Sequence, residues 1–509
     1  MSVAVAPARA TSGATGTTPE VAALRQRLRA VAAVLLDQVP PATDDAAADA
    51  GLLLDLLVSD LAGRPETARA WLTMTAVTSC YPEREELLEL VHVVRGSDVG
   101  EAAMWLLRVG AEIARTRGTP TYEMDVVQDG VLLSVDYCAR ADHHTGIQRV
   151  ARETVPRLVR DHAVLPVAWT DESWAMRTLE PIEEDRVLRW NDQIHLDRPP
   201  VPRGDFRLVV PWRCTVVLME VVLPPMCPAV DTLAEFSGSR LCAIGYDTIP
   251  LLSADLRPPA EPDNFVSYLS VLTRADTIAG ISRAASREFA GVSRMVAARG
   301  RTAPRVVEVS LPAEPPIAAA THDPGREVPL VIAVGSQEMH KNHAALLAAS
   351  EVLWDEGLDF ELQLIGRAGW GSDGLAARVA LLQSRGRRVA LRAGLSDADL
   401  VEAYRTARFS AFPSLHEGFG LPVAESLASG TPTLTTRYGS MAEIAADGGC
   451  LVVDPRDDDD IVRAMRRLLT EDDLVTALRE EALARVPRSW DDYAAQLWAD
   501  LELPGGPRA

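Results

Sequence analysis

A buried strand, a glycine-containing loop and the start of a helix follow one another in FSAFPSLHEGFGLPVAE, residues 409–425. Residues 409–413 are apolar enough for a strand inside a core. The two glycines of the loop let the backbone approach a ligand closely, and Pro422 suits the first turn of a helix. Glu425 is then expected about one turn into that helix, facing the loop. The stretch predicts an α/β domain with a ligand site beyond the end of a strand.

The same alternation extends to both sides of this stretch. Strands are predicted at 330–334, 361–365, 389–392, 409–413, 433–435 and 450–453, with helices between them. Such alternation favours a parallel, doubly wound sheet. A proline-rich linker at 311–329 precedes it, and a second alternation runs from 119 to 292. We therefore expect two Rossmann-like domains, 119–325 and 326–485, facing each other across a cleft.

The remaining segments carry no recognisable chemistry. Residues 1–18 are small and polar, which predicts a disordered tail. Helical periodicity predicts an all-helical region over 19–118, with Asp45 and Asp98 as caps. Its expected helices are 20–39, 45–62, 66–79, 83–95 and 98–117. A strand-like stretch at 126–137 follows, with a turn predicted at Asp129–Gly130, and 170–205 is too irregular to assign.

Composition limits the functional classes. The 509 residues carry 72 acidic and 51 basic side chains, a net charge of −21. That balance argues against sequence-independent nucleic-acid binding. Six cysteines without a CxxC pair indicate reduced thiols rather than disulfides or a zinc site. With neither a signal-peptide pattern nor a run of 18 apolar residues, we expect a cytoplasmic protein, with the inner membrane face as a candidate location.

Lys341 is the only lysine of the chain and lies in VGSQEMHKNH, residues 334–343. It follows a predicted buried strand and opens a helix. Free amide groups and the helix dipole attract anions at such a position, and a lysine adds a compact positive charge. Phosphate is the natural ligand, and the alternative is a solvated lysine at a helix start.

Two carboxylates bracket the amide-rich turn of the first stretch. Glu417 and Glu425 lie eight positions apart. Loop amides can hold a phosphate while a carboxylate accepts hydrogen bonds from vicinal hydroxyls. The alternative is that both acids complement a helix N-terminus, which leaves the glycines unexplained.

Glu417 and Glu425, with seven residues between them, resemble the EX7E signature of retaining GT-B glycosyltransferases of family 4. The resemblance covers residues 329–485. In the preceding domain the resemblance is limited to three short stretches, Thr145–Val150, 246–247 and 275–282. It does not extend to residues 1–118. It implies a GT-B fold, an α/β architecture of two Rossmann-like domains preceded here by the all-helical region.

The resemblance also implies roles for individual residues. Lys341 contacts the donor diphosphate, Glu417 binds a sugar hydroxyl and Glu425 accepts from the ribose hydroxyls. Asp247 is expected with Lys341 and Glu417 among the catalytic residues. The other expected donor-binding residues are Gly146, Gly335, Ser336, Gly366, Gly418, Phe419, Gly420 and Leu421. The segment 486–509 is expected to form a C-terminal helix that crosses back to the first α/β domain, and a tail.

Three positions depart from the pattern of the family. His340 stands where an arginine is common, Ser336 where some members have another arginine, and Tyr246 where a histidine is usual. Arg149 or Arg367 is then expected to balance the phosphate charge. His144 and Tyr246 are further candidates for phosphate or acceptor contacts, and His143, His144 or Asp247 for the role of the missing histidine.

The resemblance implies a retaining, metal-independent hexosyltransferase of polysaccharide or glycoconjugate biosynthesis. No cofactor is expected beyond a nucleotide-sugar donor, with GDP-mannose first and UDP- or dTDP-sugars as alternatives. The expected acceptor is a saccharide or a lipid-linked saccharide at a membrane face, and residues 19–118 are a candidate site for a protein partner. Two other hypotheses are a catalytically degenerate scaffold acting through the helical region and another GT-B enzyme such as a sugar-nucleotide epimerase.

Overall fold

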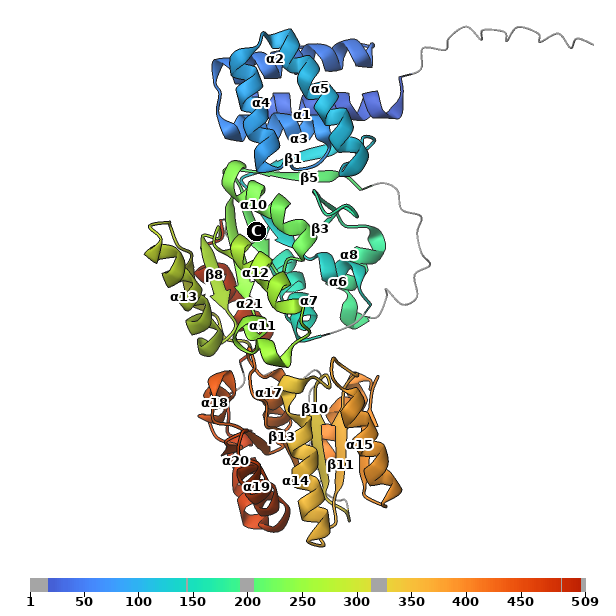
Figure 1. Ribbon diagram of the computed structural model, residues 1–509, viewed down its shortest axis with the longest axis vertical. Helices are drawn as coiled ribbons and strands as arrows, with labels where there is room; N and C mark the ends of the chain where they lie inside the picture. The colour runs from blue at the N-terminus through green and yellow to red at the C-terminus, as the bar shows by residue number, and fades with distance from the viewer. Residues whose placement is uncertain (1–16, 143–144, 193–205, 313–326, 487, 505–509) are drawn as a thin grey trace, which may run out of the picture.

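The computed structural model describes residues 17–142, 145–192, 206–312, 327–486 and 488–504. Three parts follow one another along its long axis (Figure 1): a helical region, a first α/β domain and a second α/β domain. Most of the tail predicted at 1–18 and part of the linker predicted at 311–329 lie outside the described residues.

Five helices form the N-terminal region, and local sequence explains their ends. Asp45 accepts hydrogen bonds from the amides of Ala47 and Ala48, and Asp98 accepts one from Glu101. Both therefore cap helix N-termini, as predicted. The helices are α1 (Pro19–Leu35), α2 (Ala46–Gly63), α3 (Thr67–Thr78), α4 (Arg84–Gly96) and α5 (Val99–Thr116).

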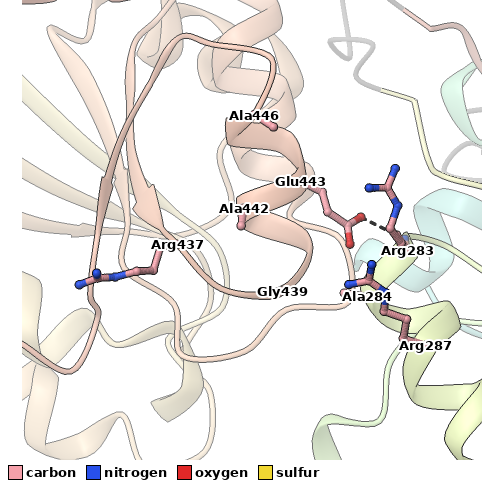
Figure 2. Close-up of a pocket in the computed structure, with 8 residues that line it drawn as sticks. All are labelled: Arg283, Ala284, Arg287, Arg437, Gly439, Ala442, Glu443 and Ala446. Carbon is pink, nitrogen blue, oxygen red and sulfur yellow. Dashed lines mark hydrogen bonds between the residues drawn. The ribbon is translucent and has the colours of Figure 1, made fainter.

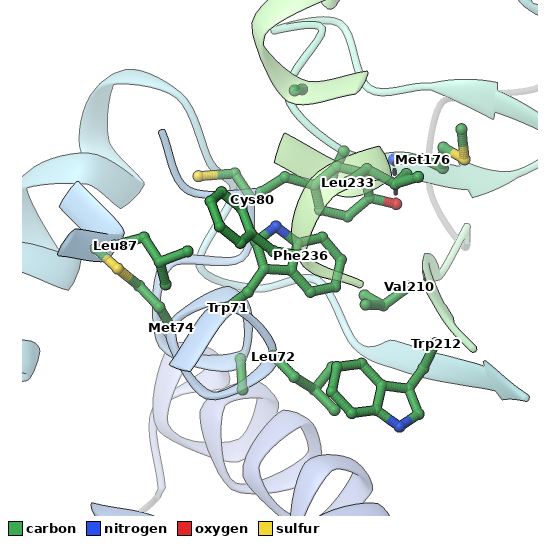
Figure 3. Packing of buried hydrophobic residues seen from close by; sticks show 14 of the residues in the cluster. Trp71, Leu72, Met74, Cys80, Leu87, Met176, Val210, Trp212, Leu233 and Phe236 are labelled. Atoms are coloured by element: carbon green, nitrogen blue, oxygen red, sulfur yellow. Dashed lines mark hydrogen bonds between the residues drawn. The ribbon is translucent and has the colours of Figure 1, made fainter. Parts of the chain in front are cut away.

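The helical region shares one hydrophobic core with the first α/β domain. Trp71 of α3 packs against Tyr81, with ring centroids 5.2 Å apart, and Tyr81 packs edge-on against Trp169 at 6.0 Å. Figure 3 shows this cluster, where Trp71 lies near side chains of the α/β domain. The Tyr81 hydroxyl donates to the carbonyl of Val209 at 2.6 Å and accepts from the amide of Met176 at 3.2 Å. The helical region and the sheet of the first α/β domain are therefore packed together as one unit.

The described strands of the first α/β domain form one sheet of order β1-β5-β4-β3-β2-β6-β7-β8-β9. β4 runs antiparallel to both of its neighbours, and the other pairs are parallel. The strands are β1 (Met124–Gln128), β2 (Val131–Ser134), β3 (Val164–Trp169), β4 (Met176–Thr178), β5 (Leu208–Trp212), β6 (Thr215–Leu218), β7 (Arg240–Gly245), β8 (Thr277–Gly280) and β9 (Arg305–Glu308).

The stretch predicted as strand-like at 126–137 with a turn at Asp129–Gly130 forms two strands around that turn, but its last residues are corrected to the start of a helix. A turn with Asp129 at a φ of +53° separates β1 from β2, and the two strands pair with different neighbours. Residues 136–140 then form a short helix, α6 (Asp136–Arg140). The other helices of this domain are α7 (Gly146–Asp161), α8 (Pro181–Leu188), α10 (Cys227–Phe236), α11 (Ile249–Leu252), α12 (Glu261–Leu272) and α13 (Arg283–Ala298).

The second α/β domain holds a fully parallel sheet of order β12-β11-β10-β13-β14-β15. The order of strands reverses between β10 and β13, the position where doubly wound sheets bind ligands beyond the carboxyl ends of their strands. The strands are β10 (Leu330–Val334), β11 (Glu361–Ile365), β12 (Val389–Arg392), β13 (Phe409–Phe412), β14 (Thr433–Thr436) and β15 (Cys450–Val453). The helices are α14 (His343–Asp355), α15 (Asp373–Ser384), α16 (Asp397–Thr406), α17 (Leu421–Ala428), α18 (Gly439–Ala445), α19 (Asp458–Thr470) and α20 (Asp472–Leu483).

The last helix, α21 (Trp490–Asp500), lies against the first α/β domain (Figure 1). Its Tyr493 and Leu497 are buried in the core of that domain, and Trp498 stacks on His162 with ring centroids 3.5 Å apart. The end of the chain thus returns from the second α/β domain to the first. Within the described residues, every helix falls short of the length and apolarity that crossing a membrane requires.

Candidate functional site

Lys341 and Glu417 form an ion pair beyond the carboxyl ends of β10 and β13. Lys341 ends the short 3-10 turn η4 (Met339–Lys341), and Glu417 lies in the loop that leads to α17. The Lys341 Nζ lies 2.7 and 2.8 Å from the two carboxylate oxygens of Glu417. Both side chains are mostly buried, at 18% and 10% exposure. The only lysine of the chain therefore sits where the topology places a ligand.

The electrostatics of this pair are set by burial and by the lysine. Burial alone would raise the pKa of Glu417, but the Lys341 ammonium lowers it below its ordinary value. Burial lowers the pKa of the neighbouring His340 to about 4, so this imidazole is neutral at pH 7. A second positive charge beside this loop comes from the first α/β domain: the Arg257 Nη1 lies 2.6 Å from a carboxylate oxygen of Glu338 and 3.4 Å from the Nδ1 of His340.

The glycines around the pair permit close contacts between backbones. A Cβ on Gly366, whose φ is +155°, would lie 1.9 Å from the carbonyl oxygen of Gly335. A Cβ on Gly418 would lie 2.4 Å from the carbonyl oxygen of Tyr246, in the other domain. Side chains at these positions would separate the loops, and in the second case the domains. Ser336, next to Gly335, is half-buried at the same strand end.

Glu425 is buried on α17 and is held from two sides. From the same domain, the Tyr404 hydroxyl donates to its Oε2 at 3.1 Å. From the other domain, the Arg149 guanidinium on α7 pairs with its Oε1. Of the two arginines predicted near phosphate, Arg149 thus lies in the cleft, whereas Arg367 is exposed beyond β11.

The loop before α17 packs against the first α/β domain. Phe419 and Leu421 contact its core cluster, and a Cβ on Gly146 would lie 3.8 Å from Leu421. The Ser282 hydroxyl donates to the carbonyl of Gly418 at 2.7 Å. The first turn of α7 therefore lies beside the first turn of α17, with the loop of Gly418 and Gly420 at the domain interface.

The structure corrects the acceptor contact predicted for Tyr246. Its hydroxyl donates to the carbonyl of Met219 at 2.5 Å, and its ring belongs to the core of the first α/β domain. Asp247, the next residue, is half-buried beside Gly418. Burial raises its pKa to about 6, and its Oδ1 accepts from the amide of Ile249 at 3.0 Å. His143 and His144 lie outside the described residues.

Sequence reasoning missed the interdomain role of His416. Its Nε2 lies 3.0 Å from a carboxylate oxygen of Glu288, and its Nδ1 lies 3.0 Å from the Ser253 hydroxyl. Burial opposes protonation of His416, but the hydrogen bond to Glu288 outweighs it and raises the pKa above its ordinary value. The sequence offered one signal for His416, its position directly before Glu417. Its partners Glu288 and Ser253 could not be predicted, because both lie more than a hundred residues away along the chain.

Another interdomain contact borders a cavity of about 370 Å³ between α13 and α18. The Glu443 carboxylate accepts from the amide of Arg283 at 3.0 Å. Figure 2 shows that Arg437 points away from Arg283 and Arg287, so the three guanidinium groups do not converge on one ligand position. The lining residues are Arg283, Ala284, Arg287, Arg437, Gly439, Ala442, Glu443 and Ala446.

No metal centre can be built from the described part of the chain. Among those residues, no three His, Cys, Asp or Glu side chains are grouped so that they could hold a metal ion. Within the described residues, Lys341, Arg149 and Arg257 bring positive charge to the interface between the domains, and Arg257 pairs with Glu338 of the loop that carries Lys341.

Replacing Gly418 with alanine is expected to push the two domains apart, because the new methyl group would overlap the Tyr246 carbonyl. Overpacking of this kind costs about 1–3 kcal/mol of stability. If the domains move apart to avoid the overlap, the radius of gyration of the protein increases. Denaturant unfolding and small-angle scattering measure the two effects. Gly374→Ala is the control, since nothing lies within 4 Å of its Cβ position. Identical scattering and stability for the two variants would contradict the prediction.

Comparison with known proteins now identifies the architecture. Residues 320–485 match the family model described as glycosyl transferases group 1. The chain is 25% identical over 334 residues to the serotype-specific mannosyltransferase WbdA of Escherichia coli, covering 62% of this chain and 39% of that protein. It is 32% identical over 168 residues to the O-antigen chain mannosyltransferase B of Escherichia coli, covering 32% and 43%. The chain thus spans about two fifths of the length of these curated relatives.

Solved structures agree with the two-domain architecture. Sucrose-phosphate synthase from Thermosynechococcus elongatus superimposes with a TM-score of 0.52 at 15% identity, covering 74% of this chain and 98% of that one. Anabaena HepE in complex with UDP and glucose superimposes with a TM-score of 0.54 at 11% identity, covering 74% and 100%. The two facing Rossmann-like domains have the GT-B fold, with the helical region added in front.

Proposed function

We propose that the protein is a retaining glycosyltransferase that moves a sugar from a nucleotide-diphospho-sugar to an acceptor hydroxyl. The observation that carries the proposal is the ion pair between Lys341 and Glu417. It lies beyond the carboxyl ends of β10 and β13, inside the segment that matches glycosyl transferases group 1. A cation and a carboxylate at that place suit a ligand with both phosphate and hydroxyl groups.

In the proposed reaction, the acceptor oxygen forms a bond to the anomeric carbon while the bond from that carbon to the phosphate oxygen breaks. The attack comes from the face of the departing diphosphate, which takes the acceptor proton, so the configuration is retained. Lys341 stabilises the negative charge that develops on the leaving group. Glu417 orients a sugar hydroxyl, Glu425 accepts from the ribose, and the loop amides from Gly418 to Gly420 hold phosphate and sugar. This route needs neither a protein nucleophile nor a metal ion.

The relatives guide the choice of substrates. Two of them are named as mannosyltransferases, and one acts on an O-antigen chain. We therefore propose GDP-mannose as the donor and a saccharide, free or lipid-linked, as the acceptor. HepE is seen with UDP and glucose, which keeps UDP-sugars as the alternative, together with dTDP-sugars.

A thermal-unfolding panel with UDP, GDP, dTDP and ADP tests the donor site. A ligand at about 100 times its dissociation constant adds about 2.7 kcal/mol of stability, so one nucleotide is expected to raise the melting temperature. The shift should vanish in Lys341→Gln, each protein being compared with itself without ligand. The absence of a shift with every nucleotide would favour the degenerate scaffold, and product analysis with the binding nucleotide's sugars separates a transferase from an epimerase.

A further inference from the structure

The turn that carries Lys341 is attached to the first α/β domain by an arginine. Arg257 follows α11 and the short turn η3 (Ala254–Leu256), and Figure 1 shows α11 at the end of the first domain nearest the second. The Arg257 Nη1 lies 2.6 Å from a carboxylate oxygen of Glu338, which directly precedes η4. The two side chains are 17% and 24% exposed. An ion pair largely shielded from water therefore joins the domains three residues before Lys341.

The Arg257 guanidinium is engaged by protein groups on each of its nitrogens. Nε and Nη2 donate to the two carboxylate oxygens of Glu261, at 2.8 and 2.6 Å. Nη1 donates to Glu338 and lies 3.4 Å from the Nδ1 of His340, a nitrogen that can accept because the imidazole is neutral at pH 7. Two carboxylates around one guanidinium leave no surplus positive charge. This arrangement favours a role in holding the loop over a direct contact with phosphate.

The loop that is held in this way leads to both charged groups of the candidate site. The Lys341 amide donates to the carbonyl of Glu338 at 3.0 Å, so these two residues share one hydrogen-bonded turn. The His340 carbonyl accepts from the amide of Leu415 at 2.8 Å, in the loop that carries Glu417. The Lys341 Nζ then pairs with Glu417. A continuous series of hydrogen bonds thus connects the arginine of the first domain to the ion pair of the second.

The turn η4 is short, so contacts from outside contribute much of its definition. The hydrogen bonds of 3-10 turns have poorer geometry than those of α-helices, and Asn342 after the turn has a left-handed φ of +60°. The Asn342 Nδ2 donates to the carbonyl of Pro455 at 2.9 Å, within the same domain. On the other side of Lys341, the contact between Arg257 and Glu338 adds a hold from the opposite domain. The place of the lysine therefore depends on both domains.

We propose that Arg257 is a positioning residue for sugar transfer: through Glu338 it fixes the turn of Lys341, so that the lysine is aligned when the two domains are in contact. This inference rests on the proposed function, in which Lys341 stabilises the charge of the departing diphosphate. A misplacement of about 1 Å can cost about 100-fold in rate. The contact therefore ties the rate of transfer to the interface between the domains.

Transfer rates at saturating donor test this role in Arg257→Met, Glu338→Gln and the double variant. Glu338→Gln leaves Arg257 paired with Glu261. Each single variant is expected to lower kcat by about 100-fold, and the double variant should lose no more than either, because both changes break the same link. Arg467→Met is the matched control and should keep the wild-type kcat. Arg467 also pairs with a glutamate four positions later, Glu471, but on the exposed surface of α19.

The Lys341→Gln background shows whether the effect passes through the lysine. Adding Arg257→Met to Lys341→Gln is expected to leave kcat unchanged, since the group that it positions is gone. A merely structural role would lower kcat by the same factor in both backgrounds and would overturn the proposal. If Arg257→Met fails to fold, Glu338→Gln carries the same comparison.

Direct phosphate binding by Arg257 makes the opposite prediction for the two single variants. Glu338→Gln would release the guanidinium and tighten donor binding, whereas Arg257→Met would weaken it. Such opposite effects, or additive losses in the double variant, overturn the positioning role. If wild-type protein transfers no sugar, the proposed function fails and the positioning role fails with it. If wild-type protein transfers sugar and Arg257→Met does so at the same rate, the positioning role alone is overturned.

Discussion

Replacing Lys341 with glutamine is expected to slow sugar transfer by about 100- to 1,000-fold, the usual effect of losing one group that stabilises transition-state charge. The chain has no other lysine, and His340 beside it is neutral at pH 7 because burial lowers its pKa to about 4. No neighbour in η4 can therefore take over the positive charge. Transfer assays with saturating donor measure the loss, since the effect should fall on the rate constant as well as on donor affinity.

The same variant should also be less stable, because Glu417 keeps its buried charge without a partner. Breaking a buried pair costs about 3–5 kcal/mol. The double variant Lys341→Gln/Glu417→Gln is the matched control: it removes both charges, so stability should return while transfer stays slow. If the double variant recovered transfer, Lys341 would act only through the folding of the loop.

The pH dependence of this stability follows from the direction of the pKa shift. In wild-type protein the pKa of Glu417 is lowered, so the pair stabilises the fold at neutral pH and loses that effect as the pH falls through the folded-state value. In Lys341→Gln, the largest interaction that lowers the pKa of Glu417 is lost and burial raises this pKa relative to wild type, so acid favours the folded variant. The stability difference between the two proteins should therefore narrow from about pH 7 to about pH 5.

The second α/β domain was predictable because its signals are local. The strands predicted at 330–334, 361–365, 389–392 and 450–453 coincide with β10, β11, β12 and β15. Each is a short apolar run between helical patterns, and parallel strands buried on both faces require such runs. The alternation of strands and helices leaves few possible topologies. The predicted ligand site at the carboxyl ends of the strands therefore followed from the order of the elements.

The parts that the sequence did not predict depend on contacts between distant residues. β4 is three residues long and runs antiparallel between two neighbours, so no periodicity marks it. Tyr246 was a candidate for phosphate or acceptor contacts because it stands where the resembling family usually has a histidine, but its hydroxyl donates to a buried carbonyl in its own domain. The His416 ring is held by Glu288 and Ser253, which belong to the other domain and come close to it only in the folded chain.

Replacing Trp71 with alanine is expected to destabilise the helical region and the first α/β domain together. Removing a fully buried tryptophan costs about 3–5 kcal/mol, and Trp71 has no exposed surface. Because its cluster includes side chains of the sheet such as Val210 and Trp212, the cavity would open at the boundary rather than inside the helices. Denaturant unfolding followed by circular dichroism should show one transition for both parts, moved to lower denaturant.

Trp370→Ala is the matched control, because that tryptophan is 43% exposed in the second α/β domain and its loss should cost less than about 0.5 kcal/mol. A separate, early transition confined to the helices in Trp71→Ala would contradict a shared core. The distinction bears on the proposed function, since helices that cannot unfold alone cannot be shed to regulate a transferase. Any partner that binds residues 19–118 would then act on a surface rigidly joined to the domain that faces the proposed donor site.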